Sequence, residues 1–236
     1  ISMPMNNPPI VDIESYEFTV KAYEGRGCID YGIHGGATAN NGGKLADLWN
    51  KTGAAAIKMF MCFSVADFPY LEDDTLYKTL KIVAENGGVA MIHAENDAML
   101  KSLERDLKAS GRTDGLAYTA SHPILAEAEA VNRALYFIEK TGAETVILHV
   151  SNAESLHMIK AAQDRGVKVY AESAPHMYAF VEEDILEKGP YLKFSPVMHD
   201  AENQKEMWDL IGRGYVQTIG SDHSPYTLAE KKPGEA

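Results

Sequence analysis

Four residues that can bind metal ions or move protons lie in or directly after short apolar runs typical of β-strands. Lys58 lies inside the run 54–63, His93 ends a second run in MIHAEN, and His149 ends a third in ILHVSN. Asp222 follows a fourth run in IGSDHSP. Two histidines, a carboxylate and a buried lysine form a donor set suited to a divalent metal ion. Each histidine alone is more often a hydrogen-bonded core residue, but the recurrence of such residues at four strand ends favours a metal site.

Lys58 has the most unusual position of the four, because an ammonium group in an apolar run loses its hydration. Such a lysine either loses its proton or meets a compensating partner. For a lone lysine in a strand, the commoner outcome is a side chain that reaches the strand end and meets a carboxylate. A neutral lysine is instead a nucleophile. The metal-ligand residue types at the three later strand ends favour this chemical role for Lys58.

The elements that must position these residues alternate along the chain. Helical patterns cover residues 13–25, 75–86, 124–142, 153–166 and 201–214, and each ends at or beside a glycine. Strand-like runs lie between them, and residues 192–197 form one further predicted strand. This alternation predicts βαβ units, a parallel sheet and the fold class α/β.

The architecture that we predict is a TIM-like (β/α)8 barrel, in which the strand ends meet on one catalytic face. The strand count falls one short of eight, so we expect a single barrel domain over residues 1–236 that lacks its first strand and a flanking small β-domain and is incomplete at both termini. The segments 64–72 and 102–121 are predicted to be active-site loops, because they are long and separate predicted elements.

Composition narrows the partners and the location. The 236-residue chain has a net charge of −12, which argues against nucleic acid or an anionic membrane surface as the main partner. No apolar run approaches the ~18 residues of a membrane span, and the N-terminus has no signal-peptide pattern. The two cysteines, Cys28 and Cys62, each lie in an apolar run. Their pattern favours reduced core thiols in a cytoplasmic protein over a disulfide.

The motifs around these residues resemble those of the cyclic amidohydrolases, the allantoinases, dihydropyrimidinases (hydantoinases) and dihydroorotases of the amidohydrolase superfamily. The matching motifs are IKMFM at Lys58, IHAEN at His93, LHVSN at His149, AESAPHMY at His176 and GSDHSP at Asp222. The resemblance implies that Lys58 is carboxylated by CO₂ and that its carbamate bridges two divalent ions, zinc by default. It makes His93 and His149 ligands of one ion and Asp222 a ligand of the other.

The same resemblance implies a reaction, the metal-dependent hydrolysis of a cyclic amide C–N bond in a hydantoin, allantoin or dihydropyrimidine. In this family a hydroxide shared by two metal ions attacks the ring carbonyl, and Asp222 would carry the proton to the leaving nitrogen. Ser195, Asn152 and His223 lie at strand ends where they would contact the substrate. Phe63 occupies the position where dihydropyrimidinases place a tyrosine, and it cannot donate a hydrogen bond. The segments MPMNNPP and GPYLKFSP favour an allantoinase-like substrate.

One departure from the family keeps alternatives open. The chain has no His-x-His motif, which in the family completes the second metal position, so we expect this chain as given to be impaired. The alternatives are a dihydroorotase and a non-catalytic scaffold protein related to dihydropyrimidinase. A deaminase with a single metal ion is a weaker alternative, because it would not need Lys58. The resemblance also implies a homo-oligomer, either a dimer or a tetramer.

Overall fold

The computed structural model describes residues 1–231, which divide into two compact units. The first unit comprises Ile1–Ala94, Arg133–Ile147 and Arg165–Val169. The second comprises Glu95–Asn132, Leu148–Asp164 and Tyr170–Ala236. Helix α6, Ile124–Thr141, begins in the second unit and ends in the first.

The first unit is built on parallel strands that pair in chain order. They are β1 (Gly35–Gly36), β2 (Ile57–Phe60), β3 (Val89–His93) and β4 (Glu144–Ile147). The start of β5 (Val169–Ser173) belongs to the same ladder, because the backbone N–H of Thr145 donates to the carbonyl of Lys168 at 2.9 Å. The helices of this unit are α1 (Ile13–Tyr23), α2 (Leu45–Lys51) and α3 (Asp73–Glu85), with a short 3₁₀ helix η1 (Gly42–Lys44).

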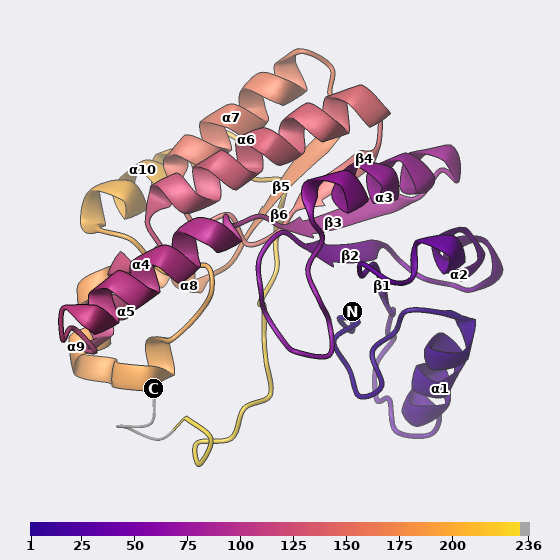
Figure 1. Cartoon of the computed structure of the whole chain (residues 1–236), viewed down its shortest axis with the longest axis horizontal. Helices are drawn as coiled ribbons and strands as arrows, with labels where there is room; N and C mark the ends of the chain where they lie inside the picture. Colours follow the sequence, from indigo (N-terminus) through magenta and orange to yellow (C-terminus); the bar gives the residue numbers. More distant parts are fainter. Residues whose placement is uncertain (232–236) are drawn as a thin grey trace. The chain divides into compact units, whose positions relative to one another are not determined.

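Burial explains why these runs form strands. All four residues of β2 are buried, as expected for a parallel sheet that is covered on both faces. Helix α3 runs alongside β3 (Figure 1) and buries Leu76, Leu80 and Val83, whose spacing places them on one helical face. The helix is followed by Gly87 with a φ of 65°, a left-handed conformation that glycine adopts without steric cost. The apolar spacing in the sequence therefore translates directly into the core of this unit.

The segment 64–72 is a loop, as predicted, and it is anchored on the sheet. Val65 and Phe68 form an isolated antiparallel bridge, and the N–H of Leu71 donates to the carbonyl of Phe60 at 2.9 Å. Phe68 is only 1% exposed and lies against Gly36 of β1. A Cβ atom at Gly36 would lie 2.4 Å from the Phe68 ring, so only glycine allows this close approach.

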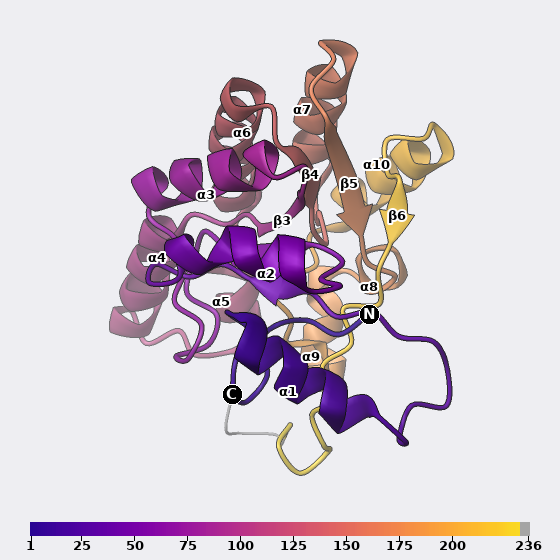
Figure 2. The ribbon, with the colours of Figure 1, turned by 90° about the vertical axis from the view of Figure 1, so that its right-hand side faces the viewer.

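The second unit contains the rest of β5 and the short strand β6 (Thr218–Ile219), which pair in parallel and lie side by side in Figure 2. Its other elements are α4 (Asp97–Ala109), α5 (Gly115–Ala120), α7 (Ala153–Asp164), α8 (His176–Ala179), η2 (Glu182–Asp184), α9 (Ile185–Lys188), η3 (Gly189–Leu192) and α10 (Ala201–Gly212). Asn96, Asp114 and Asp200 cap α4, α5 and α10, because each side chain accepts a hydrogen bond from a first-turn backbone N–H.

The structure corrects three details predicted from the sequence. Residues 192–197 do not form a strand: Leu192 ends η3, and Pro196 within the segment supplies no N–H for a ladder. Most of the predicted loop 102–121 is helical, in α4 and α5. Cys28 is exposed in an irregular segment instead of lying in the core, whereas Cys62 is buried as predicted. Within the part of the chain that is described, no helix has both the length and the apolar character needed to cross a membrane.

Candidate metal and substrate site

Lys58 and His93 lie on neighbouring parallel strands of the first unit. In the register of β2 and β3, Lys58 is opposite Met91 and Phe60 is opposite His93. Lys58 is 2% exposed and His93 is 4% exposed. Phe60 contacts both residues: its ring centroid lies 4.4 Å from Lys58 Nζ and 5.2 Å from the His93 ring. The strand ladder therefore places both side chains in one buried, aromatic environment.

A third basic residue, His34, lies directly before β1 in the same unit. Gly36, two residues after His34, is opposite Lys58 in the register of β1 and β2. His34 itself is 5% exposed. Burial lowers the pKa of His34 to about 4. Its Nδ1 atom is buried and has no hydrogen-bond partner within residues 1–231. His34 is thus held as a neutral imidazole, the form that binds metal ions.

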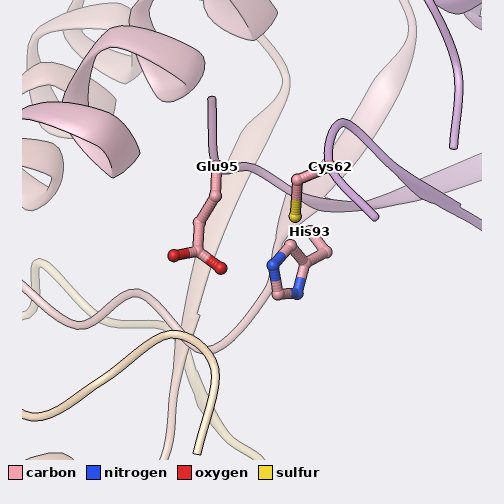
Figure 3. A group of neighbouring side chains, drawn as sticks. All are labelled: Cys62, His93 and Glu95. Atoms are coloured by element: carbon pink, nitrogen blue, oxygen red, sulfur yellow. The ribbon is translucent and has the colours of Figure 1, made fainter. Parts of the chain in front are cut away.

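Two further donors accompany His93 that the sequence patterns did not indicate as ligands. Cys62 follows β2, and Glu95 is only two residues beyond His93, so the chain itself keeps it nearby. One ligand atom from each of Cys62, His93 and Glu95 lies within 4.8 Å of the other two, and all three residues are buried. Figure 3 shows the side chains of Cys62 and Glu95 beside the His93 ring. Thiolate, imidazole and carboxylate are the ligand types that zinc takes in proteins.

His149 and Asp222, both in the second unit, share an unusual backbone conformation. Their φ angles are 37° and 48°, and they are the only residues other than glycine with positive φ between residues 1 and 231. A left-handed conformation costs roughly 1–2 kcal/mol for a residue with a Cβ atom. Strained backbone of this kind concentrates at functional sites. The chain departs from relaxed geometry at two residues that the sequence had marked as metal ligands.

A buried polar cluster holds the segment that follows His149. Ser151 donates through its backbone N–H to Glu127 Oε1 at 3.1 Å and through its hydroxyl to Glu127 Oε2. The hydroxyl oxygen also lies 3.1 Å from His199 Nε2. Burial raises the pKa of Glu127 to about 8, against the opposing effect of the Ser151 hydrogen bonds, and burial lowers the pKa of His199 to about 4. Both groups are therefore neutral near pH 7, which suits an interior polar network.

Sequence reasoning missed this cluster because Glu127 lies within a helical pattern that also fits a surface position. The available signal was its place among small residues: Ala126, Ala128 and Ala130 flank it and are all buried. A glutamate in such a buried stretch must find hydrogen-bond partners.

Comparison with known proteins identifies the family. No family model matches the chain. The chain is 32% identical to an L-hydantoinase of Paenarthrobacter aurescens over 235 residues, 99% of this chain and 51% of that protein. It is 35% identical to an allantoinase of Deinococcus radiodurans over 227 residues, 95% of this chain and 50% of that protein. The solved structure of an L-hydantoinase (dihydropyrimidinase) from Arthrobacter aurescens superposes with a TM-score of 0.95 at 31% identity, covering 98% of this chain and 51% of that chain.

The chain belongs to the cyclic amidohydrolases. The resemblance and the parallel α/β fold predicted from the sequence are thereby confirmed, and the fold matches hydantoinase TIM-barrel structures. This cyclic amidohydrolase chain spans about half the length of the curated relatives that it matches.

The substrate-contact residues predicted from the sequence have different environments in this cyclic amidohydrolase chain. Asn152 is fully buried and accepts a hydrogen bond from the Ser155 N–H at the start of α7, so it has a structural task. Ser195 is exposed, and its hydroxyl donates to Glu95 at 2.8 Å. His223 and Phe63 are both exposed, Phe63 by 58%. The other three are exposed to solvent, whereas Asn152 is fully buried.

His176 is the first residue of α8, and its imidazole interacts electrostatically with the exposed carboxylate of Asp222. Burial lowers its pKa, whereas the negative charge of Asp222 acts to raise it, so the two side chains are close enough to interact within the second unit. The His176 ring stacks on Phe194 at a centroid distance of 4.3 Å, and its Nε2 atom is buried with no hydrogen-bond partner in the described part of the chain. A buried imidazole nitrogen of this kind is a donor or acceptor that a ligand could use.

The residues present fit a divalent metal ion. Three donors of one cluster are buried, and two candidate ligands adopt strained backbone. One buried ring nitrogen of His34 and one of His176 have no hydrogen-bond partner within residues 1–231. Mixed nitrogen, oxygen and sulfur donors suit zinc and its first-row neighbours.

Proposed function

We propose that the complete protein hydrolyses a C–N bond in a cyclic amide of the allantoin, hydantoin or dihydropyrimidine type, with two divalent metal ions. The observation that carries this proposal is the left-handed backbone at His149 and Asp222, because strain is retained at precise positions only where the surrounding structure and the function require it. The similarity to an allantoinase and to L-hydantoinases supports the same reaction class.

In this proposal four residues hold the metal ions. Lys58, carboxylated by CO₂ with release of one proton, would be the ligand common to both ions, His93 and His149 would hold one, and Asp222 would hold the other. Bound divalent ions supply Lewis acidity, polarising the ring carbonyl and lowering the pKa of water. The burial of Lys58 favours the neutral amine that captures CO₂, and the aromatic contact with Phe60 fixes the direction of its side chain.

The protein groups then manage protons and orientation. Asp222 is exposed, so its carboxylate can accept a proton on one side of the reacting bond and release it to the leaving nitrogen. Ser195, held by Glu95, and His223 are placed in the proposal to contact the polar edge of the ring. Phe63 offers an apolar surface where dihydropyrimidinases are expected to offer a hydroxyl, which favours an allantoinase-like substrate.

Several finer points stay predictions from the sequence. They are zinc as the metal, a dimer or tetramer as the assembly, the cytoplasm as the location, and a single barrel domain over residues 1–236.

The decisive experiment is metal analysis of the complete protein expressed with carbon-13 bicarbonate. We expect about two metal ions per chain and a carbamate carbon resonance, as in two-metal hydrolases. The Lys58→Ala variant should lose the resonance, most of the metal and the activity on allantoin and hydantoin. Lys51→Ala is the matched control, because Lys51 is an exposed lysine on α2 paired with Asp47.

Parent protein that binds little metal, or a Lys58→Ala variant that keeps its full metal content, would refute the carbamate site. Retained metal without ring opening would instead support the scaffold alternative.

A further inference from the structure

A cavity of about 450 Å³ lies wholly within the second unit, and none of the candidate metal ligands lines it. Its walls come from the C-terminal half of α4, the connection to α5, α5 itself, α9 and η3, elements that lie close together in Figure 1. This volume falls in the ~300–1,000 Å³ range of small-molecule sites.

Most of the wall is apolar. Leu107, Tyr118, Ile185, Leu186 and Pro190 line it, and Leu186 is 65% exposed. Together with its apolar neighbours, Leu186 forms a contiguous apolar surface that an apolar group of a ligand can cover. The wall therefore suits a ligand with an apolar body.

The charges on the wall are unequal. Lys108 pairs with Glu104 at 2.5 Å, and Arg112 lies 3.5 Å from Asp114. Asp114 also caps α5, accepting a hydrogen bond from the Ala117 N–H at 3.0 Å. Both carboxylates of the wall are thus already paired with a cation.

Lys193 is the remaining cation of the wall. Its ammonium group has no carboxylate within salt-bridge distance in residues 1–231, and its Nζ lies 5.0 Å from the centroid of the Tyr118 ring. The positive charge of Lys193 acts with that of His122 to lower the pKa of Glu104, although the hydrogen bond from Lys108 is the main cause. The field of Lys193 therefore reaches into the cavity.

We propose that this cavity binds a small amphiphilic monocarboxylate, with its apolar body against Leu107, Ile185 and Leu186 and its carboxylate paired with Lys193. One uncompensated cation matches one carboxylate. A phosphate group would need a second cation, and both others on the wall are already paired. The apolar wall favours an aromatic or aliphatic acid over a small inorganic anion.

Binding of indole-3-butyrate to the full chain, measured by calorimetry against the neutral indole-3-butyramide, tests the proposal. We expect the acid to bind at least about tenfold more tightly than the amide, the effect of one charge-assisted contact of about 1.4 kcal/mol. Lys193→Met should remove this preference while leaving the affinity for the amide within about twofold. Lys205→Met, an exposed lysine on α10 outside the cavity, is the matched control and should change neither affinity.

A second variant, Leu186→Glu, tests the proposal even if Lys193→Met fails to fold. Leu186→Glu places a negative charge on an exposed part of the wall, and it should weaken the acid more than the amide. Equal affinity of acid and amide in the parent, binding of neither, or an acid preference that survives in Lys193→Met would overturn the proposal. These outcomes are independent of metal content and ring hydrolysis, so they leave the proposed function to its own test.

Discussion

Two regions of the molecule hold the four candidate metal ligands in different ways. Lys58 and His93 lie on hydrogen-bonded neighbouring strands, both buried, in a ladder whose register determines where each side chain points. His149 and Asp222 lie beyond the ends of their strands, in left-handed backbone, and Asp222 is exposed. Regular strand pairing positions the first two, whereas the second two lie in irregular backbone.

The two regions should differ in whether a substitution changes both activity and stability or activity alone. A strand ladder contributes to the core, so substitutions beside Lys58 and His93 should change stability as well as chemistry. An exposed residue in a strained turn contributes little to the core, and its replacement should change chemistry alone. Stability and activity measured on the same variants can therefore separate the two regions.

The largest effect is expected for Asp222→Asn. Loss of the carboxylate removes the proposed proton carrier and should lower kcat of the complete protein by about 100-fold or more. Because the side chain is exposed, the melting temperature should stay within about 1 °C of the parent value. Steady-state kinetics and thermal unfolding check both halves. A large drop in melting temperature would erase the contrast between the regions.

A core substitution next to His93 should have the opposite profile. Ile92→Ala removes a fully buried side chain of β3 and should lower the free energy of unfolding by about 2–5 kcal/mol. Ile219→Ala in β6 is the matched control: this isoleucine is 48% exposed, and we expect a loss below about 1 kcal/mol. Urea titrations measure both. Similar losses at the two positions would show that β6 is as well packed as β3.

The polar cluster behind His149 should make stability depend on pH. The folded pKa of His199 is about 4, lowered by burial although Asp200 and Glu95 attract its proton and His122 opposes it. The unfolded chain therefore binds more protons between pH 4 and 6.5, and the parent should lose up to about 3 kcal/mol as the pH falls through this window. His199→Gln should lose less.

Denaturant titrations at pH 7 and 4.5 compare the slopes of the parent and His199→Gln. The nearby Glu127, whose pKa is raised to about 8, has the opposite dependence, because its contribution fades as the pH rises from about 4.5 to 8. Glu127 is present in both proteins, so its pH dependence contributes to both slopes. An identical acid slope in parent and variant would contradict the predicted role of His199.

The smallest effect concerns a helix cap far from the ligands in sequence. The Asp12 side chain accepts the N–H of Ser15 and pairs with Lys44 at 2.7 Å, and these contacts lower its pKa to about 2. Asp12→Ala should cost about 1 kcal/mol in the free energy of unfolding. Asp74→Ala, in an exposed pair with Lys78, should cost less than about 0.5 kcal/mol. Chemical denaturation distinguishes the two, and equal costs would show that the cap is unimportant.

The sequence predicted the regular parts of the fold well, because alternation of helices and buried runs has a direct physical cause. Helix α6 begins and ends within one residue of its predicted bounds, and Lys58 and His93 lie on strands that pair in parallel, as the predicted sheet requires. The predicted strand at 192–197 was wrong: Pro196 inside the run has no N–H for a strand ladder, a signal that the apolar residues around it outweighed in the prediction.

The sequence predicted residues of the candidate site only where a residue type is unusual in the local sequence pattern. A lysine in an apolar run is such a case. Cys62 and Glu95 look like ordinary core and loop residues until three-dimensional proximity groups them with His93. The pairing of Glu127 with Ser151 joins residues 24 positions apart, and no local pattern encodes that contact.

The contact of Phe68 with Gly36 has a consequence for varying the loop 64–72. Loop libraries that randomise residues 64–67 should keep Phe68 constant, because its buried ring fills the space that the missing glycine side chain leaves. With that anchor retained, exposed neighbours such as Val65 are free to vary without cost to the sheet beneath. The loop 64–72 thus combines exposed residues that can vary with one buried residue, Phe68, that anchors the loop to the sheet.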